Sequence, residues 1–227
     1  MMTANAQKKG ARFTKLAREI TVAAKLGGPD PESNSRLRMA INAARADSCP
    51  KDTIERAIKK GAGLLEGVEI EECVYEGFGP HNVGIIVECQ TDNRNRTAPE
   101  IRSIFKKYNG HMGEPGSVAW MFDRLALIEG KPQKNIQDPE EEAIEAGANE
   151  VTALGENTYR FWGALEELEN IRRVLSERGW DITTAELSYK PQNYTELNET
   201  HLQEVVSLLQ ALDDNDDSHR IHASVDV

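Results

Sequence analysis

Apolar residues recur every three or four positions through the first quarter of the chain, the spacing that places them on one face of a helix. We expect three helices there: one over about Ala11–Leu26, one capped by Ser33 or Asn34, and one opened by Ser48 and Pro50. The polar residues 1–10 are expected to be mobile. Residues 1–65 are therefore interpreted as a compact three-helix domain.

From Val68 the pattern becomes that of strands. Two β-rich runs, Glu72–Tyr75 and Val83–Cys89, flank the sequence YEGFGP, whose glycines are expected to supply the backbone angles of a hairpin turn. A helix is predicted after Thr97, and a strand over Ser117–Phe122. This ββαβ order leaves the middle domain without a second helix.

Residues 125–190 follow a β-α-β-β-α-β order, which is that of a ferredoxin-like domain. After Pro191 come a helix over about Asn198–Leu212 and a strand near Arg220–Val225, and these two elements could supply what the middle domain lacks. We therefore predict an α+β protein with a helical domain (1–65), a middle domain (66–124) completed by 195–227, and an inserted ferredoxin-like domain (125–194).

The charge is divided unevenly along the chain. Residues 1–65 carry 13 Lys and Arg against 6 Asp and Glu, a net +7, whereas residues 66–227 carry a net −18. Such a split indicates a basic arm that contacts nucleic acid and a body that repels it, although small helical domains also have basic faces by chance. The three cysteines lack C-x-x-C spacing, and no apolar run has the length of a membrane span, so we expect a reduced cytoplasmic protein.

No catalytic constellation is present in the sequence. It contains no G-x-S-x-G, no P-loop, no H-E-x-x-H and no dinucleotide fingerprint, and the five histidines have no nucleophile at motif spacing. His219 and His222 would point to opposite faces of a strand, and the acidic run 213–217 lacks the glycine and glutamate of a calcium loop. We therefore expect neither an enzyme nor a metal, a cofactor or a small-molecule substrate.

The candidate site is the stretch Tyr75–Thr97. Thr97 and Glu100 have the spacing of a capping box, so Arg94 and Arg96 would lie just outside a helix N-terminus, where an anion such as a phosphate is favoured. The alternative is that both arginines form ion pairs with the acidic body. Tyr75 and Phe78, with Asn93 and Asn95, form the candidate contact loops. The two aromatic rings could stack on bases or cover a sheet edge.

Further candidate contacts to nucleic acid are cations of the helical domain: Lys8, Lys9, Arg12, Lys15, Arg18, Lys25, Arg36, Arg38, Arg56, Lys59 and Lys60. A short turn joins the second and third helices, so a helix-turn-helix that reads bases is one interpretation. The third helix has no Asn or Gln, and its cations suit phosphates equally well, so we favour phosphate contact without base reading.

Several motifs, taken in order, resemble the YebC family, which includes the mitochondrial translational activator of cytochrome oxidase subunit I. The matching stretches are FTKLAREITVAAKLGGPDPESNSRLR, PKDTIERAIKKG, YEGFGP, DNRNRT and GSVAWMF, and the likeness runs from Phe13 onward. The resemblance implies a helical N-terminal domain followed by two α+β domains, and no enzymatic activity. Family members usually begin with a basic tail containing G-H-S-K-W, whereas MMTANAQKKG precedes Ala11 here, so contacts made by such a tail are not carried over.

The resemblance implies two partners. Most members are described as DNA-binding transcriptional regulators, and others act in translation at the ribosome, where they help decode difficult stretches such as consecutive prolines. We accordingly expect a nucleic-acid-binding regulator, with DNA as the first partner and the ribosome, through its RNA, as the alternative. The sequence does not determine the oligomeric state.

Overall fold

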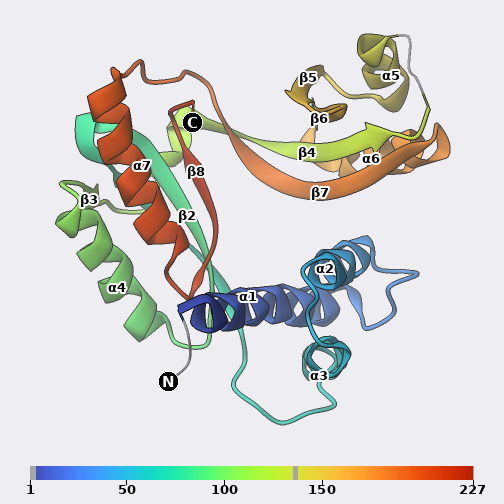
Figure 1. Cartoon of the computed structure of the whole chain (residues 1–227), viewed down its shortest axis with the longest axis horizontal. Helices are drawn as coiled ribbons and strands as arrows, with labels where there is room; N and C mark the ends of the chain where they lie inside the picture. Colours follow the sequence, from blue (N-terminus) through green and yellow to red (C-terminus); the bar gives the residue numbers. More distant parts are fainter. Residues whose placement is uncertain (1–3, 135–137, 227) are drawn as a thin grey trace. The chain divides into compact units, whose positions relative to one another are not determined.

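A computed structural model describes residues 4–134 and 138–226. The chain divides into two compact units: Met1–Asp123 with Pro191–Val227, and Arg124–Lys190 (Figure 1). The elements of the first unit are α1 (Ala4–Gly27), α2 (Ser35–Ala46), α3 (Lys51–Gly61), β1 (Glu71–Phe78), β2 (Gly84–Thr91), α4 (Arg94–Lys107), β3 (His111–Met112), α7 (Glu199–Asp213) and β8 (Ser218–Ala223). Those of the second are β4 (Phe122–Pro132), which begins at the boundary, α5 (Pro139–Ala146), β5 (Glu150–Gly155), β6 (Thr158–Gly163), α6 (Leu168–Glu177) and β7 (Trp180–Pro191).

The three N-terminal helices pack around one apolar cluster, as the periodicity predicts. Ile20, Leu37 and Ile54, one from each helix, are buried at its centre. Asn34 caps α2, since its side chain accepts a hydrogen bond from the Leu37 amide. The prediction of a mobile segment over residues 1–10 is wrong for residues 4–10, which form the first turns of α1, and residues 1–3 lie outside the described residues.

A four-stranded sheet forms the rest of the first unit, in the order β3-β1-β2-β8. β1 and β2 are antiparallel, and β8 joins the other edge of β2, although more than a hundred residues separate them in sequence. In Figure 1, α4 and α7 lie side by side along this sheet. Their residues Ile101, Phe105 and Leu208 pack with Ile85 and other β2 side chains into a second apolar cluster. The C-terminal helix and strand therefore complete the middle sheet.

The interpretation of YEGFGP as a turn is wrong for residues 75–78, and only Gly79 and Pro80 lie in the connection between β1 and β2. Residues 75–78 belong to β1, and the hairpin turns at His81 and Asn82, which hold the left-handed angles φ 61° and 59°. Gly77 is required for packing: a Cβ there would lie 2.7 Å from the His111 carbonyl oxygen and 2.8 Å from the Phe105 ring.

The strand predicted over Ser117–Phe122 is also wrong: residues 119–121 form a short 3₁₀ turn. Glu76 explains it. Its carboxylate, in a residue only 9% exposed, accepts hydrogen bonds of 2.7 Å from each of the Gly116, Val118 and Ala119 amides. In a strand, backbone amides donate hydrogen bonds to a neighbouring strand. Here all three amides donate to one buried carboxylate instead. Burial raises the pKa of Glu76, but the three amide bonds outweigh it and hold that pKa below the usual range.

The second unit is an antiparallel sheet in the order β5-β6-β4-β7, with α5 and α6 packed against it. Numbered within the unit, this strand order is 2-3-1-4, as expected for the ferredoxin-like β-α-β-β-α-β arrangement. Phe161 and Trp180 meet edge to face at 4.9 Å in its core. Trp162 is also buried.

The chain leaves and re-enters the first unit at one place. Where β4 begins, the Met121 carbonyl accepts a hydrogen bond from the Gln192 amide at 2.9 Å. The Gln192 side chain also donates to Asp123, again at 2.9 Å. The predicted fold class, a three-helix domain followed by two α+β domains with one inserted into the other, is confirmed. The exact domain boundaries stay a prediction. Within residues 4–134 and 138–226, no helix combines the length and apolarity needed to cross a membrane.

Candidate nucleic-acid interface

Helix α4 begins one turn earlier than the predicted capping box. Asn93 is its N-cap, and the Asn93 side chain accepts hydrogen bonds from the amides of Asn95 and Arg96. Thr97 cannot serve as the cap, because its hydroxyl is buried and donates to Asp217 at 2.7 Å. The capping box of Thr97 and Glu100 is therefore wrong, and Arg94 and Arg96 lie inside the first turn of the helix.

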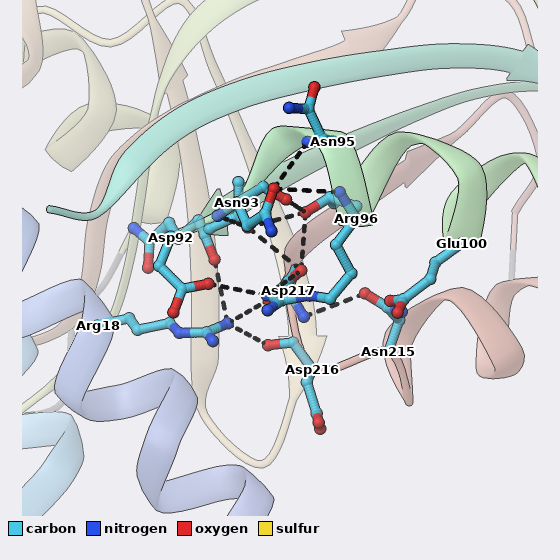
Figure 2. A network of polar contacts seen from close by, with 12 residues as sticks. Arg18, Asp92, Asn93, Asn95, Arg96, Glu100, Asn215, Asp216 and Asp217 are labelled. Atoms are coloured by element: carbon cyan, nitrogen blue, oxygen red, sulfur yellow. Dashed lines mark hydrogen bonds and ion pairs between the residues drawn. The ribbon is translucent and has the colours of Figure 1, made fainter. Parts of the chain in front are cut away.

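Asp217, just before β8, is the centre of the polar network beside this helix end (Figure 2). Its side chain is 1% exposed, and its carboxylate accepts hydrogen bonds from Arg18 at 2.8 Å and from Arg96 at 2.9 and 3.0 Å. The Arg18 guanidinium also donates to the carbonyl oxygens of Gln90 and Asp216. Three segments far apart in sequence thus share one buried carboxylate.

This network already supplies carboxylates at the helix N-terminus where the sequence predicted a bound phosphate. Burial raises the pKa of Asp217, but hydrogen bonds from Arg96, Thr97 and Arg18 outweigh it and hold the pKa below its usual range, so the group is ionised. The hydrogen bonds of Arg96 to Asp217 and Asp92 raise the pKa of its guanidinium. Arg96 therefore already has two carboxylate partners.

Arg94 is paired as well. Its guanidinium lies 2.7 Å from a Glu71 carboxylate oxygen and donates to the Glu72 carbonyl at 2.9 Å. Both members of that ion pair are more than half exposed, so the pair lies at the surface. Arg94 and Arg96 thus form ion pairs with acidic residues, as in the alternative interpretation of the sequence. A contact of either arginine with nucleic acid stays a prediction.

The two candidate contact loops do not lie together. In the β1–β2 hairpin Phe78 pairs with Gly84 and Glu71 with Thr91, so YEGFGP ends at one end of β2 and Asn93 follows the other. The eight residues of β2 span about 25 Å. Tyr75 packs into the apolar cluster under α4 and α7, and the Phe78 ring lies 5.6 Å from that of His111. The Asn95 side chain points away from the network in Figure 2.

Most cations of the helical domain are bound to the protein itself. Arg36 makes a two-pronged ion pair with Glu19 at 2.8 and 2.9 Å and also contacts Glu72. Lys25 pairs with Glu69, and Lys15 donates to the Asp213 carbonyl. Like Arg18, these side chains connect the basic helices to later parts of the first unit: to β1, to the segment just before it, and to the end of α7.

Two further candidates are held within the helical domain. Arg12 pairs with Asp47 at 2.6 Å, although its own side chain is 68% exposed. Arg38 donates to the carbonyls of Pro31 and Glu32. Part of the basic charge of residues 1–65 therefore stabilises the fold instead of facing a partner.

Arg56, Lys59 and Lys60 of α3 differ from these residues. None forms an ion pair or side-chain hydrogen bond with another residue of 4–134 or 138–226, and Arg56 and Lys59 are exposed. Lys8 and Lys9 at the start of α1 are exposed too, and the Lys9 ammonium lies 5.5 Å from the centre of the Phe13 ring. These five residues are the predicted contacts whose charge remains open to a partner.

A groove of about 530 Å³ runs between α1, α3 and the segment after α3. Arg56 and Lys60 line it together with three threonines, and two acidic residues, Glu66 and Asp92, line it as well. Phe13, Leu65 and Ile70 supply its apolar wall. The hydroxyls of Thr14 and Thr21 already donate to backbone carbonyls, so the donors open to a ligand are the cations. Cations beside an apolar wall suit a phosphate with a sugar or base attached. In the described part of the chain, no three His, Cys, Asp or Glu side chains are grouped to hold a metal.

Sequence reasoning missed Asp217 and Glu76. Asp217 ends the acidic run 213–217, for which the sequence only excludes a calcium loop, and its side-chain partners are 120 or more residues away. Glu76 lies inside YEGFGP, and its partners lie in GSVAWMF. The joint presence of these two motifs was the signal available.

Comparison with known proteins gives a consistent result. Residues 1–64 match a family model described as "TACO1/YebC protein N-terminal domain", and residues 70–225 match one described as "TACO1/YebC second and third domain". A protein of Bdellovibrio bacteriovorus is 62% identical over 97% of this chain and 94% of its own length, and one of Geobacter sulfurreducens is 46% identical over 97% and 89%. Both are named "probable transcriptional regulatory protein".

A solved structure agrees as well. The crystal structure of a conserved hypothetical protein from Aquifex aeolicus has a TM-score of 0.85 and 42% identity, and the match covers 96% of this chain and 90% of that one. The relatives support a regulator at the level of the family. From the two family models and these identities, the chain belongs to the TACO1/YebC family.

Proposed function

We propose that this protein is a nucleic-acid-binding regulator of gene expression, and that it binds DNA through α3 and the adjoining groove. The observation that carries the proposal is the cationic end of α3, formed by Arg56, Lys59 and Lys60, which have no ion-pair partner among the residues that the structure describes. Because most neighbouring cations are already bound to carboxylates or carbonyls of the fold, these three charges, like those of Lys8 and Lys9, can pair with a phosphate at little cost.

The spacing supports phosphate contact. Residues 56, 59 and 60 are three and four positions apart, so they lie on one side of the helix. Lysine binds phosphate as a mobile point charge, and α3 has no Asn or Gln with which to read adenine. We therefore propose binding with weak sequence preference, in which α3 holds the backbone. The acidic sheet stays away from it.

The test is a salt titration of binding to a mixed-sequence DNA duplex. If three phosphates are neutralised, the slope of log Kobs against log salt is about −3 for that contribution. Replacing Arg56, Lys59 and Lys60 together with alanine should make the slope shallower by about 3 and weaken binding at low salt. A matched control replaces Arg102, Lys106 and Lys107 of α4 with alanine, because it removes the same charge from another exposed helix of the same unit. Equal loss in both variants, or none in either, would refute a role specific to α3.

The second candidate is a translation factor that binds the ribosome through its RNA. The net −18 of residues 66–227 favours it, because such a body is repelled by a long duplex but can be accommodated where bound protein and irregular RNA share a surface. Crosslinking in cells, followed by sequencing of the attached nucleic acid, separates the two. Promoter DNA supports the first candidate, and ribosomal RNA with co-sedimentation on ribosomes supports the second.

A further inference from the structure

Two of the three cysteines face each other across the β1–β2 hairpin. Cys73 and Cys89 are direct partners in the antiparallel register, so their side chains leave the sheet on the same face. Cys89 is buried in the apolar cluster, and Cys73 packs against that cluster while remaining half-buried. Cys49, the third cysteine, is buried in the separate core of the helical domain.

The surroundings divide the two thiols into a nucleophile and a proton donor. The hydrogen bond from the Cys89 thiol lowers the pKa of Cys73 to about 7, with further help from Tyr75 and Arg94 and against the effect of burial. The same hydrogen bond and burial raise the pKa of Cys89. Burial also raises the pKa of Cys49. Since the thiolate is the reactive form, Cys73 is the thiol that an electrophile should find first.

We propose that Cys73 and Cys89 are a reversible redox pair, which a hydroperoxide converts into a disulfide across the hairpin. The Cys73 thiolate attacks the peroxide oxygen, so that the O–O bond breaks and Cys73 becomes a sulfenic acid while hydroxide leaves and is protonated. The Cys89 sulfur then attacks the Cys73 sulfur, and the S–O bond breaks. The Cys89 proton and the departing hydroxide form water. In total, two thiols and one hydrogen peroxide give one disulfide and two waters.

The geometry allows this bond with a small adjustment. Directly opposite residues in an antiparallel pair have Cβ atoms about 4.5–5.5 Å apart, whereas a disulfide needs about 3.5–4.5 Å. The register against β8 shifts between Glu88 and Cys89, and such an irregularity interrupts the ladder on that side of Cys89. A disulfide that must draw two strands together is more easily reduced than a relaxed one, which suits a reversible modification.

To test this, the protein is treated with hydrogen peroxide, and the number of free thiols per chain and the mass of the intact chain are then measured. Thiols should fall from three to one, with the loss of two hydrogens, and dithiothreitol should restore both values. The remaining thiol should be Cys49, as identified by peptide mapping. At pH 7, alkylation of Cys73 should be about threefold faster than that of a free cysteine, because its larger thiolate fraction outweighs the lower nucleophilicity of a thiolate with a lower pKa.

Two variants complete the design. Cys89→Ser should leave Cys73 able to form a sulfenic acid, trapped by dimedone, but unable to form the intramolecular disulfide, whereas Cys49→Ser should behave as the unaltered chain. A circular dichroism spectrum matching the parent shows that each variant is folded. Peroxide that leaves all three thiols free, that carries Cys73 on to a sulfinic acid with Cys89 unreacted, or that oxidises Cys49 first would overturn the proposal.

Discussion

Removing the Asp217 carboxylate is the sharpest test of the structure. In an Asp217→Ala variant, Arg18 and Arg96 lose their shared partner and the buried hydroxyl of Thr97 loses one of its acceptors. Breaking a buried ion pair by deleting one partner costs about 3–5 kcal/mol, because the other charge stays desolvated. The Arg18 side chain is 15% exposed, so it fits this case.

The magnitude converts to a large thermal shift. A change of 1 kcal/mol lowers Tm by about 2–4 °C in units of about 150–250 residues, so the expected loss is roughly 6–20 °C. Arg96→Ala should cost less, about 1–2 kcal/mol, because Arg18 still faces Asp217. Arg94→Ala removes a surface pair and should cost under about 1 kcal/mol.

The two units provide an internal control. Trp162 and Trp180 are both buried in the second unit, so in a Trp120→Phe background tryptophan fluorescence reports unfolding of that unit. Calorimetry reports both units. Asp217→Ala should lower the calorimetric transition of the first unit and leave the fluorescence transition unchanged. The reasoning fails if Asp217→Ala shifts the first transition no more than Arg94→Ala does.

The remaining predictions concern three other residues. Burial, with the charge of Arg220, lowers the pKa of His219 to about 4 from an ordinary 6.5. Between these two pH values the unfolded chain binds a proton at His219 that the folded chain does not. The free energy of unfolding should therefore fall by roughly 3 kcal/mol as the pH drops from 6.5 to 4. His219→Gln should flatten a urea-midpoint profile in that window, and an unchanged slope would exclude His219 as its source. Gly77→Ala should cost about 1–3 kcal/mol in urea unfolding, because its Cβ meets the Phe105 ring, and a neutral result would contradict that packing. Glu76→Ala leaves three amides without an acceptor and should speed hydrogen exchange at Val118 and Ala119 while α3 amides stay unchanged.

The fold was predictable where one local signal dominates. The helices around Ile20 and Ile54 follow from periodicity alone, since each buries one regular face. The prediction failed where a distant group overrides the local signal. The sequence from Ser117 to Phe122 suits a strand, but its amides bind Glu76 some forty residues earlier. Thr97 suits a cap, but its hydroxyl binds Asp217 instead.

The candidate site was harder for the same reason. Residue type shows that Arg18, Arg36 and Arg56 carry charge, but only the tertiary fold decides which of them a carboxylate neutralises. Arg18 meets Asp217 across 199 positions, whereas Arg56 meets no carboxylate in the described chain. Charge counted along a sequence therefore overestimates the charge that a partner encounters.

The hydrogen bonds that join Met121 and Asp123 to Gln192 have an architectural consequence. The chain leaves and returns to the first unit at residues that are hydrogen-bonded to each other. Residues 124–190 are therefore an insertion whose two ends lie side by side. The entropy of closing such a loop grows only slowly with its length. The first unit should then be nearly indifferent to what fills the loop, so a short connector in its place should leave the helical bundle and its sheet able to fold. The inserted domain is in this sense an exchangeable module.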